Sequence, residues 1–212
     1  DLPVAGSHAI IGDRAYGEDA ETVARLGRAA AEGLLAGGVL PVFKHVPGHG
    51  RARSDSHLEL PTVDTSREEL ERSDFAPFRA NADLPLAMTA HVVFKAIDPE
   101  RPATLSPVVV SEIIRGFIGF DGLLMSDDLS MKALSGSFRE RTQALFAAGV
   151  DLGLHCNGDL SEAGEVATEA PLLAGTALER AERALARIAT ARLAFDPVES
   201  RAKLASMLAS AA

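Results

Sequence analysis

Short apolar runs alternate with helix-forming segments along this chain, and this alternation limits the fold more than any other feature. Four runs have the length of a buried strand, namely 39–43, 84–93, 123–125 and 150–154. Helical spacing or a helix-opening pair marks five further segments, namely 19–36, the segment from 106, 138–148, 175–194 and 199–210. Strands that alternate with helices form a parallel sheet covered by helices, so the pattern predicts an α/β fold.

The number of units sets the size of the sheet. Four strand–helix units form either a small open sheet or half of a (β/α)8 barrel. A complete barrel takes about 250 residues for eight units, whereas four units use almost all of the 212 residues present. A complete barrel therefore does not fit, and we expect a single domain over residues 1–212.

Several local signals fix the ends of the predicted helices. Gly37 and Gly38 end the first helix. Ser66 is a candidate N-cap with Glu69 three residues later as its capping-box partner. Pro107 after Ser106 suits the first helical position, where its missing N–H costs nothing.

Composition excludes several classes of function. The 21 basic and 30 acidic residues give a net charge of −9, which argues against a nucleic-acid or acidic-membrane partner. Cys156, the single cysteine, excludes an internal disulfide and a multi-cysteine zinc site. We find no apolar run of about 18 residues that would suggest a membrane span, and no signal-peptide pattern.

Reactive side chains follow the C-terminal end of every predicted strand. They are Lys44, His45 and His49 after the first, His91 after the second, Asp127 and Asp128 after the third, and His155 and Cys156 after the fourth. In parallel α/β folds this edge of the sheet binds ligands. Any one of these histidines could simply bond to backbone, but four of the chain's six lie at this edge.

Asp127 and Asp128 are adjacent at the end of a predicted strand. Neighbouring strand residues point in opposite directions, so only one carboxylate faces the pocket easily. The other is expected to bond to backbone or to cap the following helix. Taken alone, the pair is also compatible with two caps.

A second constellation, Asp55-Ser56-His57, lies in a long polar loop. Residues two apart in an extended segment share a side, so Asp55 is able to reach the ring of His57. A carboxylate there fixes the imidazole tautomer and favours the protonated ring. Such a histidine can give and take a proton near neutral pH. The alternative reading is a solvated turn.

The loop after the first strand has three further features. Lys44 ends a strand that we expect to be buried on both faces, so it needs an anionic or hydroxyl partner. Gly48 and Gly50 allow sharp turns and a close approach to a ligand, but the order of residues is not that of a phosphate loop. His45 and His49 have i,i+4 spacing, yet Pro47 forbids the helix that would make them a metal pair. We predict no metal and no cofactor.

Five motifs in this order and spacing carry a resemblance to a known family. They are KHVPGHG at 44–50, DSH at 55–57, GLLMSDDLSM at 122–131, IGDRAY at 11–16 and MTAH at 88–91. The chain resembles, from about residue 1 to 195, bacterial β-N-acetylglucosaminidases of glycoside hydrolase family 3, of the NagZ type. Val46 stands where that family usually has Phe.

The resemblance implies a fold and an activity. Family members are (β/α)8 barrels of the TIM type that remove terminal β-linked N-acetylglucosamine with retention of configuration. The single-domain type acts in the cytoplasm on 1,6-anhydro-N-acetylmuramyl peptides during peptidoglycan recycling. On this reading the chain supplies the C-terminal half of the barrel, because the family's first strands match nothing here, and a second chain or fragment completes it.

The resemblance also assigns roles to residues. Asp127 matches the nucleophile, His57 the acid/base and Asp55 its partner. Lys44, His45 and Arg14 match residues that hold sugar hydroxyls, and we group His91 with them as a substrate-binding residue. Most retaining glycosidases use two carboxylates, and a histidine here takes the place of one.

Three alternatives remain open from the sequence. A neutral histidine repels an anion less than a carboxylate does, so the same site could use phosphate as a glycoside phosphorylase. A glucose-specific hydrolase would differ only in the sugar. A non-catalytic sugar-binding or assembly module is the third, because part of the family's site has no counterpart in the chain.

Overall fold

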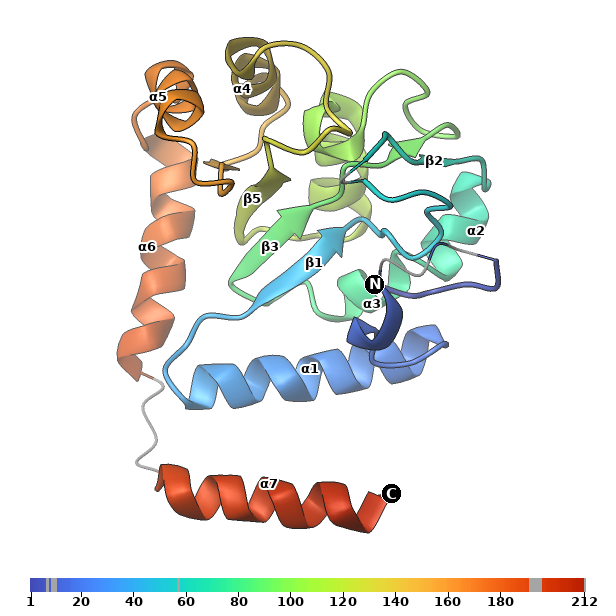
Figure 1. Ribbon diagram of the computed structural model, residues 1–212, viewed down its shortest axis with the longest axis vertical. Helices are drawn as coiled ribbons and strands as arrows, with labels where there is room; N and C mark the ends of the chain where they lie inside the picture. The colour runs from blue at the N-terminus through green and yellow to red at the C-terminus, as the bar shows by residue number, and fades with distance from the viewer. Residues whose placement is uncertain (7, 9–10, 57, 191–195, 212) are drawn as a thin grey trace.

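A four-stranded parallel sheet forms the centre of the computed structural model (Figure 1). The structure describes residues 1–6, 8, 11–56, 58–190 and 196–211. The strand order is β1-β3-β5-β6, so neighbours in the sheet follow one another along the chain. The strands span Val42–Val46 (β1), Leu86–Thr89 (β3), Leu123–Asp128 (β5) and Leu152–Leu154 (β6).

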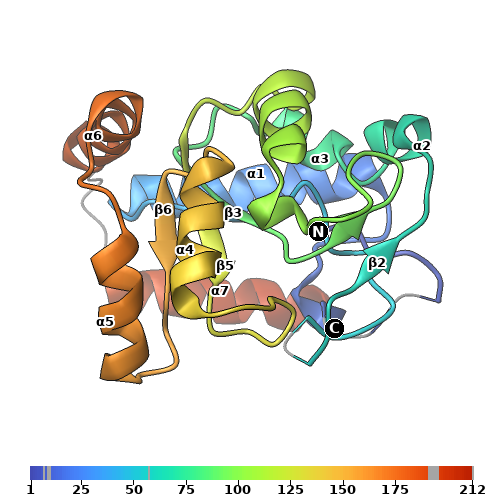
Figure 2. The same cartoon turned by 90° about the horizontal axis from the view of Figure 1, so that it is seen from above.

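Helices connect successive strands and cover the sheet, as the alternation predicts (Figure 2). The longer ones are α1 (Ala20–Ala36), a π-helix (Val109–Phe117), α4 (Phe138–Ala147), α5 (Leu160–Glu169), α6 (Gly175–Thr190) and α7 (Pro197–Ala211). Two short helices, α2 (Arg67–Arg72) and α3 (Ala76–Ala80), lie between β1 and β3. The 3-10 turns are Gly12–Arg14 and Ala103–Leu105. Helix α5 is not anticipated by the sequence pattern.

The predicted caps account for several helix ends. The side chain of Ser66 accepts the Glu69 N–H at the start of α2, and the hydroxyl of Ser106 accepts the Val109 N–H. The carboxylate of Glu69 forms an ion pair with Arg51 in the preceding loop, at 3.0 Å. Helix α1 ends at Ala36, directly before Gly37, as predicted.

The strands differ from the predicted runs mainly in where they end. The predicted run 39–43 becomes β1 at 42–46, because the chain stays extended through the polar residues that follow the apolar run. The predicted strand 84–93 divides into β3 and the two-residue strand β4 (Val93–Phe94). Strand β4 pairs in parallel with β2 (Thr62–Val63), which places the long polar loop after β1 beside the sheet.

The hydrophobic core lies on one face of the sheet. Along β5, Leu124 packs in the main core with Ile113 and Phe120, whereas Leu123 and Met125 on the opposite face belong to a smaller cluster with α6. This two-residue alternation puts Asp127 on the face of Met125. The direction of the Asp127 side chain thus follows from the packing of β5.

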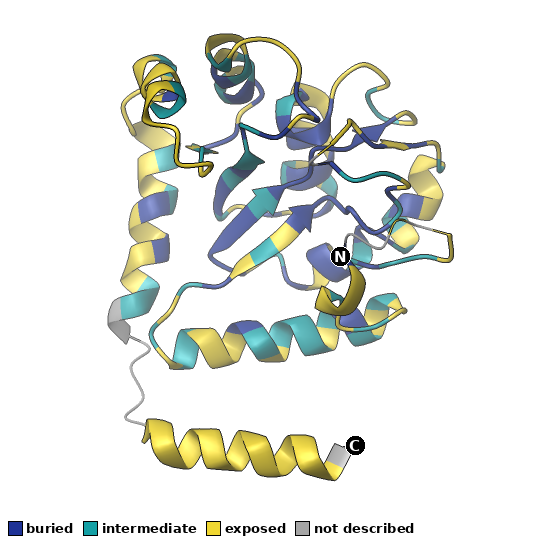
Figure 3. Ribbon diagram, viewed as in Figure 1, coloured by how far each residue is buried: buried dark blue, intermediate teal, exposed yellow. Residues whose placement is uncertain are grey.

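Helix α6 lies across the N-terminal ends of the strands (Figure 1). Arg180 bonds to Asp121 and Asp151, which precede β5 and β6, and Arg187 donates to the carbonyl of Asp83 before β3. Helix α7 is exposed along its described length (Figure 3). None of the described helices is both long and apolar enough to cross a membrane.

The sheet has two open edges within the described residues. Strands β1 and β6 each pair on one side only. On the face opposite the main core, Val42 is 37% exposed and Lys44 is exposed. The expectation that this strand is buried on both faces is therefore wrong, because Val42 and Lys44 line a cavity beside α1 instead of packing in the core. The fold is α/β with a parallel sheet, and the four strands do not close into a barrel.

Candidate functional site

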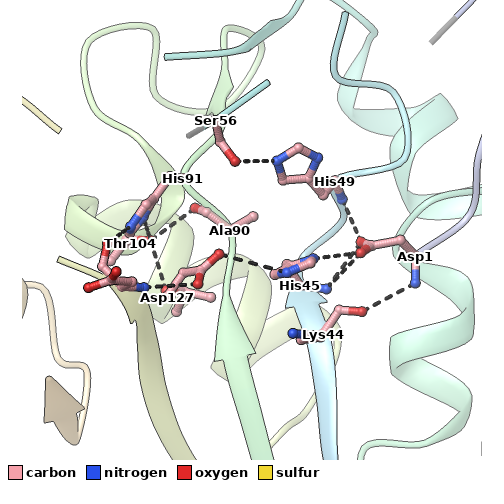
Figure 4. A network of polar contacts seen from close by, with 11 residues as sticks. Asp1, Lys44, His45, His49, Ser56, Ala90, His91, Thr104 and Asp127 are labelled. Carbon is pink, nitrogen blue, oxygen red and sulfur yellow. Dashed lines mark hydrogen bonds and ion pairs between the residues drawn. The ribbon is translucent and has the colours of Figure 1, made fainter. Parts of the chain in front are cut away.

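Two strands that are not neighbours bring the central residues of the candidate site together. Asp127 is the next-to-last residue of β5 and His45 lies in β1, with β3 between the two strands. The ring Nε2 of His45 lies 3.7 Å from Oδ2 of Asp127 (Figure 4). Both side chains are at the C-terminal edge of the sheet, where the sequence pattern predicts the site.

The two adjacent aspartates have separate tasks, as their opposite directions predict. Asp128 accepts hydrogen bonds from the Ser130 N–H and hydroxyl and from the N–H of Cys156. Burial alone would raise the pKa of Asp128, but these hydrogen bonds outweigh it and hold the pKa below its ordinary value. Among the described residues, Asp127 accepts one such bond, from the Asp128 N–H to Oδ1 at 2.8 Å, and its Oδ2 faces His45.

The surroundings of His45 keep its ring neutral. The side chain is 8% exposed, and Nδ1 lies 2.6 Å from the carboxylate of Asp1. Burial lowers the pKa of His45 to about 3, and the charge of Asp127 opposes this shift without overcoming it. A neutral ring carries one proton, so one of its nitrogens acts as a hydrogen-bond acceptor.

His49 holds the polar loop rather than the site itself. Its Nε2 lies 3.0 Å from the hydroxyl of Ser56, and both residues are buried. Burial lowers the pKa of His49 to about 4, with a further decrease from the nearby His45. Nδ1 of His49 is buried without a hydrogen-bond partner among the described residues. The carbonyl of Ser56 also accepts the N–H of Ala133 at 3.3 Å. Ser56 is therefore bonded both within its own loop and to the loop that follows β5.

His91 is fully buried and supports the nucleophile region from below. Its Nε2 donates to the carbonyl of Asp128 at 3.0 Å, and its Nδ1 lies 2.8 Å from the hydroxyl of Thr104. Burial lowers the pKa of His91. The Thr104 hydroxyl also donates to the carbonyl of Ala90, so His91 belongs to a buried network of protein groups. No ring nitrogen is left for a ligand. The contacts described for His91 are all to protein groups, and its expected contact with substrate stays a prediction.

The predicted sugar-binding residues Arg14, Lys44 and His45 share one cavity of about 250 Å³. Its other wall is mostly apolar and includes Tyr16 and Phe78. Arg14 comes from the 3-10 turn near the N-terminus and Lys44 from β1, so the cavity lies beside the free edge of the sheet. Cations beside an apolar wall suit a polyhydroxylated ligand with both polar and apolar faces.

The predicted acid/base pair is described only in part. Asp55 lies half-buried in the polar loop, where its carbonyl accepts the N–H groups of Leu58 and Glu59. His57 lies outside the described residues. The pairing of these two side chains therefore stays a prediction.

Asp1 and Thr104 are site residues that sequence reasoning missed. Asp1 is 43 residues before Lys44, and no periodicity or motif links them. The close contact depends on Gly50, because a Cβ there would meet the carbonyl of Leu2 at 1.8 Å. The predicted close approach at Gly50 is thus to the chain's own N-terminal segment, and a glycine at that position is the one available signal.

No three His, Cys, Asp or Glu side chains in the described part of the chain come together in a way that could hold a metal ion. The arrangement instead offers one directed carboxylate, neutral imidazoles and two exposed cations. These groups suit nucleophilic attack by a carboxylate on a neutral, hydroxylated substrate.

Comparison with known proteins gives this arrangement a context. Residues 2–191 match the glycosyl hydrolase family 3 N terminal domain. The chain belongs to glycosyl hydrolase family 3. The family match covers every described residue of the candidate site except Asp1.

Family 3 relatives with established names are similar along much of the chain. A β-hexosaminidase of Alkalilimnicola ehrlichii is 44% identical over 156 residues, which cover 72% of this chain and 44% of the relative. A β-hexosaminidase of Tolumonas auensis is 42% identical over 163 residues, covering 74% of this chain and 48% of the relative. The chain thus spans about half the length of the curated relatives it matches.

Solved structures of the family have the same fold. A family 3 β-N-acetylglucosaminidase from Paenibacillus sp. str. FPU-7 has a TM-score of 0.80 at 34% identity, covering 92% of this chain and 40% of that one. NagZ from Neisseria gonorrhoeae, in complex with N-trifluoroacetyl-D-glucosamine, has a TM-score of 0.76 at 34% identity, covering 90% and 56%.

Proposed function

We propose that this chain carries the nucleophile of a retaining β-N-acetylhexosaminidase. The observation that carries the proposal is the division of labour between the two aspartates at the end of β5. Asp128 is engaged by loop hydrogen bonds, while Oδ2 of Asp127 faces His45 beside the cavity that holds Arg14 and Lys44. The names of the family relatives, β-hexosaminidase and β-N-acetylglucosaminidase, support the substrate class.

In the first step, Oδ2 of Asp127 attacks the anomeric carbon. A bond forms between these two atoms as the bond from the anomeric carbon to the leaving oxygen breaks. His57 gives its proton to that oxygen, so the leaving group departs as an alcohol. The bond from the Asp128 N–H fixes Oδ1 and keeps the carboxylate turned toward the substrate.

In the second step, water completes the reaction. His57, now neutral, takes a proton from the water. The water oxygen attacks the anomeric carbon as the bond between that carbon and Oδ2 of Asp127 breaks. Two displacements at one carbon retain its configuration. Asp55 holds the ring of His57 and stabilises its charged form, as a carboxylate beside an imidazolium does.

The whole enzyme needs more strands than this chain supplies. The two open sheet edges and the exposed face of β1 support completion of a (β/α)8 barrel by a second polypeptide or a further stretch of the same protein. We place the activity in the cytoplasm, on 1,6-anhydromuramyl peptides released during peptidoglycan recycling. Pulldown of the chain with the barrel's other half, produced separately, tests the completion.

A covalent trap tests the nucleophile directly. A fluorinated aryl β-glycoside with a good leaving group forms the glycosyl-enzyme but hydrolyses slowly. We expect peptide mass spectrometry to locate the sugar on Asp127. Matched Asp128→Asn protein should still be labelled, whereas labelling at any other residue would overturn the assignment.

Leaving-group dependence tests His57. Only poor leaving groups need a proton in the first step, so His57→Ala should slow their release far more than that of an activated aryl leaving group. Equal losses on both substrates would reduce His57 to a binding residue.

Product analysis separates the remaining candidates. Glycosyl phosphate, formed when phosphate is supplied, would identify a phosphorylase. Binding of N-acetylglucosamine without turnover, by the chain and its barrel partner together, would favour a sugar-binding module.

A further inference from the structure

The carboxylate of Asp1 is buried inside the loop that follows β1. Its side chain is 3% exposed. Oδ1 accepts the N–H groups of His49 at 2.7 Å and of His45 at 3.1 Å, and Oδ2 lies 2.6 Å from the ring Nδ1 of His45. Bonds of this kind to an ionised carboxylate are among the stronger ones in proteins. A carboxylate with so many N–H donors around it is fixed in orientation (Figure 4).

This contact determines which nitrogen of His45 carries the proton. An ionised carboxylate only accepts hydrogen bonds, so the group facing it at 2.6 Å is Nδ1–H. Burial lowers the pKa of His45 and favours the neutral ring, in which Nε2 has a lone pair and no proton. Nε2 lies 3.7 Å from Oδ2 of Asp127, which is also an acceptor, and no hydrogen bond joins the two atoms.

The opposite tautomer would change the nucleophile. With the proton on Nε2, the ring would donate toward Oδ2 of Asp127, the oxygen that remains after Oδ1 accepts the Asp128 N–H. A hydrogen bond to that oxygen would lower its nucleophilicity. With the proton on Nδ1, Oδ2 stays available and Nε2 can accept a proton from a hydroxyl of the bound sugar.

We propose that Asp1 is a positioning residue that holds His45 in the tautomer protonated on Nδ1. His45 then acts as a hydrogen-bond acceptor for a substrate hydroxyl and leaves Oδ2 of Asp127 free to attack. The use made of His45 rests on the proposed function, whereas the tautomer itself does not.

Nitrogen NMR of the chain labelled with 15N-histidine tests the tautomer without any turnover. Two-bond 1H–15N spectra distinguish a protonated ring nitrogen from one with a lone pair, and a His45→Gln variant assigns the signals. We expect His45 at neutral pH to be protonated on Nδ1 alone. A ring protonated on Nε2, on both nitrogens, or averaged as in an unfolded chain would overturn the proposal. The measurement on unaltered protein holds even where variants fold poorly.

Asp1→Asn should move the proton. The carboxamide can offer its NH2 to Nδ1 and its oxygen to the backbone N–H groups, so the neutral ring would become protonated on Nε2. The matched control is Asp159→Asn, because Asp159 caps α5 away from the site and Asn caps a helix equally well. We expect the control spectrum to match that of the unaltered chain. An Asp1→Asn spectrum with Nδ1 still protonated would overturn the role of Asp1.

Kinetics of the completed enzyme provide the second readout. Asp1→Asn should lower kcat by about 10- to 100-fold, as small misplacements of reacting groups do, and should also raise KM through the lost hydroxyl acceptor. A shifted tautomer with unchanged kcat and KM would overturn the proposed use of His45. Loss of the covalent label at Asp127 in unaltered protein would instead count against the proposed function.

Discussion

The two ends of the sheet treat buried charge in opposite ways. At the N-terminal end, Asp151 accepts from Arg115 and Arg180 at 2.8 and 3.0 Å and from the Leu124 N–H, so its charge is fully paired. At the C-terminal end, Asp127 faces a neutral His45 at 3.7 Å. Pairing at the N-terminal end stabilises the fold. At the C-terminal end such pairing is missing among the described residues, and the proposed function uses the unpaired carboxylate.

Asp127→Asn removes the unpaired carboxylate at the C-terminal end of the sheet and should give the largest effect, a loss of turnover. Turnover of an aryl β-N-acetylglucosaminide by the completed enzyme should fall by about 10⁴-fold, because the amide is a poor nucleophile. Stability in urea should change little, since Asn still accepts the Asp128 N–H. A variant with near-normal turnover would remove the proposed contrast between the two ends.

Asp151→Ala removes the paired carboxylate at the N-terminal end of the sheet instead. It leaves Arg115 and Arg180 largely buried without this partner, which typically costs 3–5 kcal/mol of unfolding free energy. Urea denaturation measures the loss. The matched control is Glu112→Ala, because Glu112 pairs with Arg67 on the exposed surface and should cost about 1 kcal/mol or less. Equal losses would mean that burial of the ion cluster contributes nothing.

His91→Phe tests the support beneath the nucleophile. The aromatic ring is kept, but two hydrogen bonds are lost, at about 0.5–1.5 kcal/mol of unfolding free energy each. The penalty for an unsatisfied group does not arise, because the Asp128 carbonyl keeps the Met131 N–H and the Thr104 hydroxyl keeps the Ala90 carbonyl. We expect kcat to fall while KM stays within about twofold, since the described partners of His91 are all protein groups. A rise in KM alone would restore His91 as a substrate contact.

Acidification should give the smallest of these effects, a loss of unfolding free energy as His49 at the C-terminal end of the sheet becomes protonated. The pKa of His49 lies at about 4 in the folded chain, below the ordinary 6.5. Between these values the unfolded chain binds the extra proton, so stability is full above pH 6.5 and falls as pH decreases toward 4. By pH 5 the loss should be about 2 kcal/mol for this ring. Urea unfolding of His49→Gln at pH 7 and 5 should show a smaller fall, and an identical fall would contradict the assignment.

Features that depend on neighbouring residues were predictable from the sequence. The helix at 20–36, its end before Gly37 and the opposite directions of Asp127 and Asp128 all follow from local spacing and strand geometry. The family is likewise confirmed. The predicted gathering of His45 and Asp127 at the C-terminal edge of the sheet agrees with the structure, while their roles stay predictions.

Features set by distant contacts were not predictable. Nothing near Asp1 signals that its carboxylate reaches His45 and His49. His91 at a strand end follows the same pattern as a ligand-binding histidine, and only the position of Thr104, 13 residues later, shows that its ring is fully engaged. Burial on both faces was a wrong expectation for β1, because the apolar run does not reveal what covers the strand.

The strand edges that no other described strand pairs, at β6 and at the start of β1, have a consequence for handling this polypeptide. Asp1 already engages the Lys44 carbonyl and the His45 N–H of β1. All four strands run the same way, so the first residues of β1 in one molecule can hydrogen-bond to the outer side of β6 in another. Such head-to-tail addition repeats with every molecule unless the rotation brings the last back to the first. Concentrated preparations lacking a capping strand are therefore expected to associate end to end, so samples for NMR should be dilute or contain a peptide that covers the β6 edge.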